Sequence, residues 1–530
     1  MCFLLSWEAC YETIIIRRIK LILSNIVSIC FIVFILLFFF FFRPNNSWHY
    51  LYINDIQNFH KAIILVSLVF TILLTVIPMS LSPYWNGTMV FKADKQQYDR
   101  MGDALLQGRL YIDNNDIDPA LEAMDNPYDG FERQRLGVRF NWDEAYYNHH
   151  YYMYFGVVPT ILLFIPFKLI TGQALQCYQA TQFFAALTII GIFYLFYIMC
   201  QYLFPCFPFS QYIVLSSAFS LLCIGYSISA PALYCTAIVS GVCLMVWSII
   251  CFLKGVWIEK YNNSGTIYLF FGSLLGALVF GCRPPVALAN IVVVAVLYQL
   301  FKDKGGTSDR IVKEVVYVIT PYFVVGVFLM LYNYVRFDNV FEFGQSYQLT
   351  VTDQHSYGNV LARLDLKLLF SGMLSSLYGS TVPLDSFPFL VFNGAFVNFP
   401  ILILSIRIFS LDIARILKTK KIYLVSVLMF LVTFIIALLD VYWTPFLLER
   451  YHLDFYYLLC IVSFVTIAAW LEINLFNNKK KKIILCILTV LAFAVFVVEF
   501  LLFCVPFDYN YTYWHPEILD EIYRGLRFGI

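Results

Sequence analysis

The chain has 530 residues, of which 61% are hydrophobic and only 13% are charged, and its formal net charge is +1. Soluble domains carry about 25% charged residues, so an ordinary soluble domain is excluded, and the charge balance gives no reason to expect a nucleic-acid partner. Apolar runs of about 20 residues recur along the chain, and a helix of that length can cross the hydrocarbon core of a membrane. The sequence therefore predicts an all-α polytopic integral membrane protein.

The apolar runs predict about 11 to 13 transmembrane helices. They fall near 21–42, 62–82, 153–170, 178–204, 209–228, 232–253, 266–282, 286–301, 314–335, 387–410, 422–440, 453–475 and 483–505. Polar stretches at 83–152, 336–386 and 506–530 separate or follow them.

Three short basic loops indicate the orientation, because positively charged loops stay on the cytoplasmic side. They lie at 302–313, 407–421 and 479–482, with an even number of spans between successive loops. The 336–386 loop and the C-terminal tail are then expected outside the cytoplasm. The side of 83–152 stays open, because the run 153–170 holds two prolines and Lys168 and is short for a full crossing. If that run crosses, 83–152 is cytoplasmic, and if it lies in the interface, 83–152 is extracytoplasmic.

The charged segment 91–113 is predicted to form an amphipathic helix along the membrane surface. At 100° per residue, one face carries Asp94 with Tyr98, Met101 and Leu105 each within about 40° of it. Asp99 and Asp103 lie on the opposite face, which we expect to be solvated. A carboxylate on an apolar face is costly without a partner or a task, so Asp94 is a candidate functional residue. The alternative is a helix N-terminal aspartate that stabilises free backbone N–H groups.

The order of a transmembrane run, Asp94, Tyr98 and a short helix ending in Gly-Arg-Leu-Tyr resembles the start of the GT-C membrane glycosyltransferases. That group includes the aminoarabinose transferase of lipid A and the protein O-mannosyltransferases. Asp94 and Tyr98 stand where the group has Asp-Glu-x-x-Tyr, although Lys95 replaces the second acidic residue. Further matching phrases are NPYDGFERQRLGVRFNWDEAYYNHHYYMYFGVVP (126–159), GCRPP (281–285), YNYVRFDNVFEFG (332–344) and LLERYHLDF (447–455). They are similar to bacterial members of the group, and the resemblance covers most of 62–475.

The resemblance implies a GT-C-like fold with juxtamembrane helices in an extracytoplasmic first large loop, 83–152. It divides the chain into an N-terminal region with an extra hydrophobic helix (1–61), a transmembrane catalytic module (62–475), and a last transmembrane helix with its tail (476–530). The implied activity is inverting direct transfer of a sugar from a polyprenyl-phosphate-linked donor to an acceptor hydroxyl of a lipid, glycan or protein. The implied location is the bacterial cytoplasmic (inner) membrane, with the site facing the periplasm or exterior.

Such a transfer needs a general base for the acceptor hydroxyl. Asp94 is the first candidate for the base. Asp143 is the second, because it begins another Asp-Glu-x-x-Tyr phrase; its alternative is a loop carboxylate paired with Arg135 or Arg139. The remaining expected members of the substrate cavity are Tyr98, Glu144, Tyr152 and Arg336.

The lipid phosphate that leaves needs cationic or hydrogen-bonding neighbours. Arg283 and Arg450 are the candidate phosphate ligands, and His149 and His150 stand roughly where some relatives carry a lysine for this purpose. The alternatives are an interfacial anchor for Arg283, a structural ion pair of Arg450 with Glu449 or Asp454, and interfacial packing for the histidines.

Asp116 and Asp118 form an Asp-x-Asp pair that could hold a divalent cation, but a solvated acidic loop is the commoner meaning of such a pair. We therefore expect no metal and no cofactor other than the lipid-linked sugar. Two other functions remain open. A transporter or flippase of lipid-linked glycans would line its path with the same charges, and a non-catalytic member of the group would only bind them.

Overall fold

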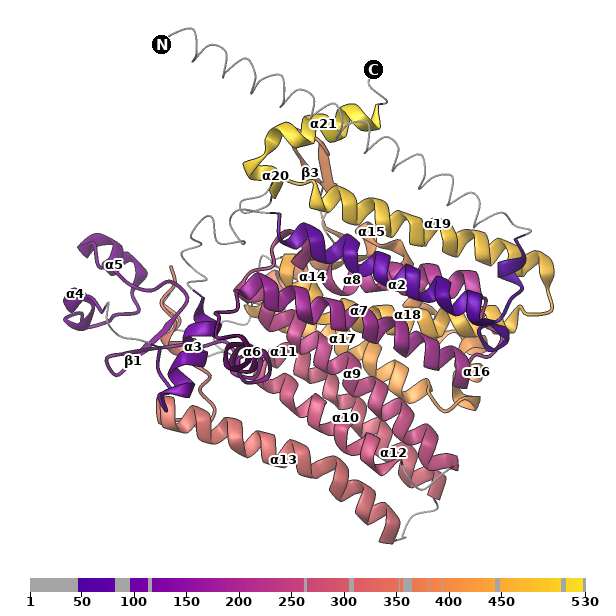
Figure 1. The fold of residues 1–530 in the computed structure, drawn as a ribbon, viewed down its shortest axis with the longest axis horizontal. Coiled ribbons are helices and arrows are strands. Elements are labelled where there is room, and N and C mark those ends of the chain that lie inside the picture. Colours follow the sequence, from indigo (N-terminus) through magenta and orange to yellow (C-terminus); the bar gives the residue numbers. More distant parts are fainter. Residues whose placement is uncertain are drawn as a thin grey trace.

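The structure is a computed structural model that describes residues 46–81, 96–112, 117–261, 265–304, 309–351, 353–355, 365–379, 381–392, 394–443, 449–506 and 511–527. A bundle of helices makes up the body, and the short elements α3 (Gln97–Leu106), α4 (Pro119–Glu122), α5 (Gly130–Leu136) and β1 (Ala145–Tyr147) lie at its left end in Figure 1. Two small two-stranded antiparallel sheets accompany the helices in this part of the chain.

Eight helices in the described residues are long and apolar enough to cross a membrane, which confirms the predicted all-α polytopic class. They are α2 (Asn58–Met79), α7 (Cys177–Tyr202), α8 (Phe209–Ser229), α9 (Leu233–Tyr261), α13 (Asp309–Phe337), α17 (Tyr423–Trp443), α18 (Leu453–Ile473) and α19 (Asn478–Phe503). The predicted run 21–42 lies outside the described residues.

Four of the expected spans form shorter segments instead, namely 153–170, 266–282, 286–301 and 387–410. The run 266–282 becomes α10 (Thr266–Leu278) and the turn η4 (Val279–Gly281), and 286–301 becomes α11 (Pro284–Ala287), η5 (Leu288–Ile291) and α12 (Val292–Lys304). The run 387–410 is divided among β4 (Leu390–Phe392), α15 (Ala395–Asn398) and the 3-10 helix η8 (Pro400–Phe409). Glycines interrupt the run 266–282, prolines and a glycine interrupt 387–410, and two prolines directly precede 286–301, and a hydropathy average registers none of this.

The run 153–170 forms only the π-helical turn η3 (Thr160–Phe164) and α6 (Ile165–Thr171). At 1.5 Å per residue this segment is less than about 20 Å long, too short to cross a hydrocarbon core of about 30 Å. The length of the run 153–170 therefore favours the alternative in which it lies in the membrane interface and does not cross. Conversely, α14 (Leu366–Tyr378) is a short apolar helix inside the stretch that the sequence marked as polar.

The core lies between α7, α8, α9 and α18. In α9 and α18, 83% of the apolar window is buried by protein, against 17% in α2 at the periphery. Helices that are apolar on every side belong in such a position. Phe196 of α7 stacks on Phe464 of α18 at 3.9 Å between ring centroids, which joins two central helices far apart in sequence.

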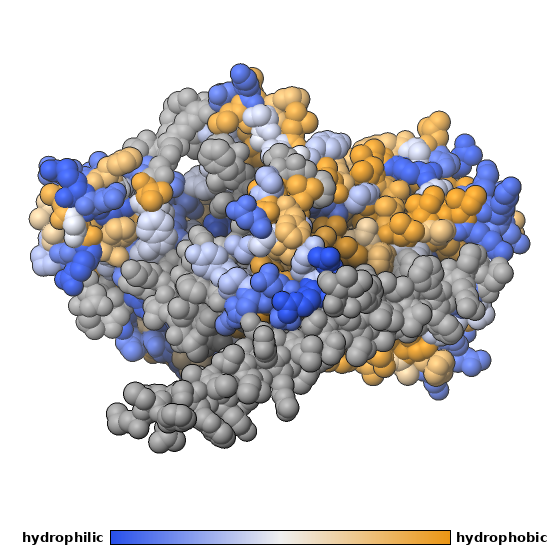
Figure 2. Space-filling view, turned by 90° about the horizontal axis from the view of Figure 1, so that it is seen from above, coloured by the Kyte–Doolittle hydropathy of each residue, from blue (hydrophilic) through white to orange (hydrophobic). Residues whose placement is uncertain are grey.

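Apolar side chains cover much of the helical body in Figure 2, while hydrophilic ones gather at its two ends. The left end carries α3 (Gln97–Leu106), α4 (Pro119–Glu122), α5 (Gly130–Leu136) and the hairpin of β1 (Ala145–Tyr147) and β2 (His150–Tyr152). Further elements are α16 (Leu411–Thr419), β3 (Thr381–Pro383), α20 (Tyr511–Trp514), α21 (Pro516–Leu526) and the short 3-10 turns η1 (Ser47–His49), η2 (Ile53–Asp55), η6 (Gln345–Tyr347) and η9 (Glu449–His452). The polar end with α3–α5 positions the site described next.

Candidate active site

Asp143 is held where the first large loop meets the second. Its backbone N–H donates to the carbonyl of Leu349 at 3.1 Å, and the N–H of Leu349 donates to the carbonyl of Glu144 at 3.0 Å. Ala145 at the start of β1 pairs with Gln348 in the same antiparallel sense. Two segments about 200 residues apart in sequence therefore fix the position of one carboxylate.

The Asp143 side chain is only 6% exposed, and its φ of 57° lies in the left-handed region that non-glycine residues rarely adopt. One carboxylate oxygen, Oδ1, accepts a hydrogen bond from Gln348 Nε2 at 2.9 Å. The other, Oδ2, accepts from the hydroxyl of Tyr234 at the beginning of α9. Strained backbone at a buried carboxylate is a frequent feature of functional sites.

Burial raises the pKa of Asp143 to about 6, and the positive charge of Arg450 and the hydrogen bond from Gln348 only partly oppose this effect. A carboxylate with a pKa near neutrality is ionised at pH 7 and still basic enough to accept a proton. Two of its lone-pair positions accept the bonds from Tyr234 and Gln348, which leaves others for a substrate hydroxyl.

Arg450 brings a positive charge close to this carboxylate. Its guanidinium lies over the ring of Tyr234 at 4.1 Å, so one tyrosine contacts both Asp143 and Arg450. Within the described residues, no carboxylate lies at ion-pair distance from Arg450. The expected alternative of an ion pair with Glu449 or Asp454 is therefore not seen there, and the guanidinium remains available to an anion.

Arg283, by contrast, already has an anionic partner. Its Nη2 lies 2.7 Å from Asp454 Oδ2, and its Nε lies 3.1 Å from both oxygens of that carboxylate. Asp440 of α17, which is 3% exposed, also acts electrostatically on this guanidinium. The Arg283 side chain lies over Tyr451 at 5.0 Å, next in sequence to Arg450. The two candidate phosphate ligands are thus neighbours, and Arg450 has the uncommitted charge.

Two glycines bring the loop of Asp143 against the helix break that carries Arg283. A Cβ at Gly156 would collide with the carbonyl of Gly281, and a Cβ at Gly281 would collide with Val158. The phrases YFGVVP and GCRPP therefore meet backbone to backbone, which only glycine permits.

The other expected cavity residues have partners within the protein. Glu144 is fully buried and forms an ion pair with Arg100 at 2.6 Å, while its second oxygen accepts from Asn141 at 3.0 Å. Tyr98 is buried with its ring stacked on Phe164 at 5.2 Å. Both side chains are therefore packed within the protein.

Tyr152 and Arg336 occupy the junction between β2 and α13. Tyr152 packs on Phe337 at 5.1 Å, and Arg336 donates to the carbonyl of Met153 at 2.8 Å and to Asn333 at 2.9 Å. Both side chains are nearly buried. Their contacts hold the hairpin on the end of α13.

His149 and His150 lie at the turn of the β1–β2 hairpin, at the opposite end of β1 from Asp143. His149 is exposed, with Nδ1 3.3 Å from a carboxylate oxygen of Glu122, and His150 stacks on Tyr111 at 4.2 Å. Within the described residues, neither histidine contacts Arg283 or Arg450.

Asp94 and Asp116 lie outside the described residues, so their expected roles remain predictions. Asp118 accepts hydrogen bonds from the backbone N–H groups of Ala120 and Arg139 and thereby caps α4. In the described part of the chain, no group of three or more histidine, cysteine, aspartate or glutamate side chains could hold a metal ion.

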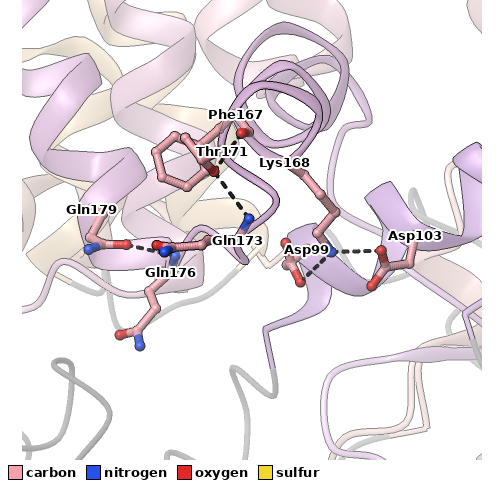
Figure 3. A network of polar contacts seen from close by, with 8 residues as sticks. All are labelled: Asp99, Asp103, Phe167, Lys168, Thr171, Gln173, Gln176 and Gln179. Atoms are coloured by element: carbon pink, nitrogen blue, oxygen red, sulfur yellow. Dashed lines mark hydrogen bonds and ion pairs between the residues drawn. The ribbon is translucent and has the colours of Figure 1, made fainter.

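The sequence interpretation of the 91–113 helix requires a correction. The helix α3 begins at Gln97, after Gln96 in a left-handed conformation, and Asp99 is not solvated but only 7% exposed. Figure 3 shows the cause: Lys168 of α6 reaches Asp99 at 2.9 Å and Asp103 at 2.6 Å. The face of α3 opposite Tyr98 is therefore covered by Lys168 of α6. A helical projection of one segment cannot show this, because Lys168 belongs to another helix.

This network allows a prediction about the attachment of α3. In Lys168→Met the two carboxylates lose their cation, and we expect the amides of α3 to exchange with solvent about tenfold faster, as for a loss of about 1–2 kcal/mol. Hydrogen–deuterium exchange in nanodiscs measures this, with Lys168→Arg as the control that keeps the charge. Equal exchange in Lys168→Met and the parent would show that the ion pairs do not anchor α3.

Sequence reasoning missed Tyr234, Gln348 and Asp440. Tyr234 and Asp440 are at helix ends within apolar runs, and Gln348 is in a loop without a motif. The only available signal was that an ionisable residue inside an apolar run marks a candidate site, which applies to Asp440.

The sequence matches no protein-family profile, and no curated protein is significantly similar to it. Similar solved structures include the oligosaccharyltransferase of Archaeoglobus fulgidus in the apo form, at 10% identity and a TM-score of 0.46. They also include the archaeal oligosaccharyltransferase AglB in complex with an inhibitory peptide and a dolichol-phosphate, at 11% identity and a TM-score of 0.46. In both comparisons the match covers 84% of this chain and 56% of the other, so this chain spans a little over half the length of those proteins. The function is therefore argued from the residues of this chain.

Proposed function

We propose that the protein is a membrane glycosyltransferase of the GT-C type that uses a polyprenyl-phosphate-linked sugar. The observation that carries the proposal is a buried carboxylate, Asp143, with a pKa raised to about 6, next to a guanidinium, Arg450, without an anionic partner in the described residues. A proton acceptor beside an anion site is what displacement of a phosphate by a hydroxyl requires.

In the proposed reaction the acceptor oxygen attacks the anomeric carbon while its proton passes to the carboxylate of Asp143. The bond between the anomeric carbon and the phosphate oxygen breaks, the electron pair stays on the phosphate, and the configuration at the sugar inverts. Arg450 stabilises the charge that collects on the phosphate. Arg283, held by Asp454, maintains Tyr451 and the neighbouring Arg450 in place. Asp94 remains the alternative base and is tested in parallel.

The site is proposed to face the exterior of a bacterial cytoplasmic membrane, because 153–170 is too short to cross and the loop of Asp143 then lies outside. Labelling a single cysteine at the exposed position Gln107 with a membrane-impermeant maleimide on intact cells tests this side. Labelling only in inverted vesicles would place the loop in the cytoplasm and remove the basis of the proposal.

Transfer itself is tested with the full chain in nanodiscs, a radiolabelled polyprenyl-phosphate hexose, and a membrane extract as acceptor. Formation of labelled product that disappears in Asp143→Asn supports the proposal. Movement of the labelled lipid across proteoliposomes without any new glycosidic bond would instead establish a transporter.

Arg450 gives a further prediction. Arg450→Gln should raise the KM for the lipid donor about 10- to 100-fold, because a charge-assisted contact of about 1.5–3 kcal/mol is lost, while the KM for the acceptor should stay within a factor of two or so. Arg450→Lys should restore part of the donor affinity because the charge remains. An unchanged donor KM in Arg450→Gln would exclude Arg450 as the phosphate ligand.

A further inference from the structure

An aromatic ladder joins the two large loops outside the helical body. It consists of Tyr128 and Tyr147 from the first loop and Tyr347 and His355 from the second. Tyr147 and Tyr347 lie 4.5 Å apart between ring centroids, and Tyr128 lies 5.9 Å from Tyr347. His355 stacks against Tyr128 at 5.1 Å and against Tyr347 at 5.7 Å, with interplanar angles of 27° and 25°.

The aromatic ladder rests on a buried residue and is itself partly exposed to solvent. Beneath it lies Phe337, which is 2% exposed and contacts the rings of Tyr147 and Tyr347 at 5.9 and 5.5 Å. The three ladder tyrosines are half-buried and His355 is exposed. Rings that served only as core would be covered on both sides, so the ladder presents apolar surface to the aqueous side of the loops.

Carboxylates and amides border these rings. Asp338 follows the last residue of α13 with a φ of 54°, in a left-handed helix-end position that usually carries glycine. Its Oδ2 accepts from the hydroxyl of Tyr147 at 3.3 Å. Asp353 accepts a hydrogen bond from the side-chain amide of Asn126 at 2.9 Å. Asp353 lies two residues before His355 in the sequence, and Asn126 lies two residues before Tyr128. An aspartate kept at a strained position next to an open aromatic ring indicates a recognition role.

The aromatic ladder is continuous with Asp143. Tyr347 immediately precedes Gln348, whose amide donates to the Asp143 carboxylate, and Tyr147 ends the strand that begins two residues after Asp143. Ala145 and Gln348 pair across the same junction. A ligand that lies along the ladder therefore has one end directed toward the proposed base.

We infer that the aromatic ladder binds the acceptor as a saccharide chain. Pyranose rings present an apolar C–H face that packs on aromatic rings and hydroxyl groups in their plane that donate to carboxylates such as Asp338. A lipid acceptor would not use the bordering carboxylates. The inference rests on the proposed function for the role of the saccharide as acceptor, but the binding itself is measurable without donor.

The test uses the full chain in nanodiscs, without donor, and maltotetraose, chitotetraose and mannotetraose as probes. Saturation-transfer NMR should detect binding of at least one of them. In the double variant Tyr147→Ala/Tyr347→Ala the dissociation constant should rise about tenfold or more, since two stacking contacts are lost. Tyr347→Phe, which keeps the ring, should retain binding. Tyr298→Ala, which removes an exposed tyrosine of α12 outside the ladder, is the matched control.

Absence of saturation transfer from the parent protein to any of the three saccharides would overturn the inference, as would undiminished binding in the double variant with an unchanged unfolding temperature. The two proposals can fail separately. Saccharide binding at the ladder with no sugar transfer would leave the inference and remove the function. Transfer to a lipid or peptide, with no loss in the ladder variant, would leave the function and remove the inference.

Discussion

Asp143→Asn is expected to reduce kcat for sugar transfer by about 10²- to 10⁴-fold, the range that a positioned general base contributes. The asparagine keeps the size of the side chain and can still accept from the hydroxyl of Tyr234, but it cannot take a proton. The activity of the parent should fall as the pH decreases through about 6, because burial raises the pKa of Asp143 to that value and protonation removes the base. The pH dependence of kcat and of kcat/KM, measured for the parent and the variant, tests both effects.

The stability of this variant separates catalysis from folding. The folded-state pKa of Asp143 lies above the ordinary 3.8, so its contribution to stability is fully present below about pH 4 and is lost as the pH rises through about 6. Neutral asparagine should therefore leave the unfolding temperature at pH 7 equal to or above that of the parent. Asp94→Asn, measured in parallel, decides between the two candidate bases: full activity in Asp143→Asn with loss in Asp94→Asn would transfer the role to Asp94.

Arg283→Leu is expected to cause the largest loss of stability, about 3–5 kcal/mol, because it leaves the fully buried carboxylate of Asp454 without its cation. Asp454→Leu should destabilise to a similar extent by leaving the guanidinium alone. The unfolding midpoint in mild detergent measures both variants at one pH.

The double variant Arg283→Leu/Asp454→Leu is the decisive control. Replacing both members of a buried ion pair by apolar residues is often close to neutral, so the double variant should recover most of the stability lost in either single variant. Failure of the double variant to recover any stability would contradict the pairing. If it recovers and its donor KM is unchanged, Arg283 is a structural cation and Arg450 alone binds the phosphate.

The eight long helices were predictable because their apolar residues run without interruption for the length of a membrane. The interrupted runs were not, since η8 depends on Pro400 and on packing against α18 rather than on mean hydropathy, and α15 packs against α14 and η8. Hydropathy also failed to show α14, which lies within a stretch that polar residues flank on both sides.

The candidate site was predictable in its charged members and not in its geometry. Asp143, Arg283 and Arg450 were selected from short phrases, and the structure places all three around Tyr234 and Tyr451. The ion pair between Asp454 and Arg283 forms because α18 packs against the helix break before α11. No pattern in the nearby sequence indicates that tertiary contact. The solvated position expected for Asp99 was wrong for the same reason, because Lys168 comes from another helix.

The contact between Gly156 and Gly281 has a consequence for how the protein can vary. At Gly281 an added methyl group would meet the side chain of Val158, but at Gly156 it would meet the backbone carbonyl of Gly281, which no rotamer change can move. An alanine there would separate the carboxylate from the guanidinium groups without touching either of them. Variation among related proteins should therefore accumulate around Asp143 and Arg450 while Gly156 stays fixed.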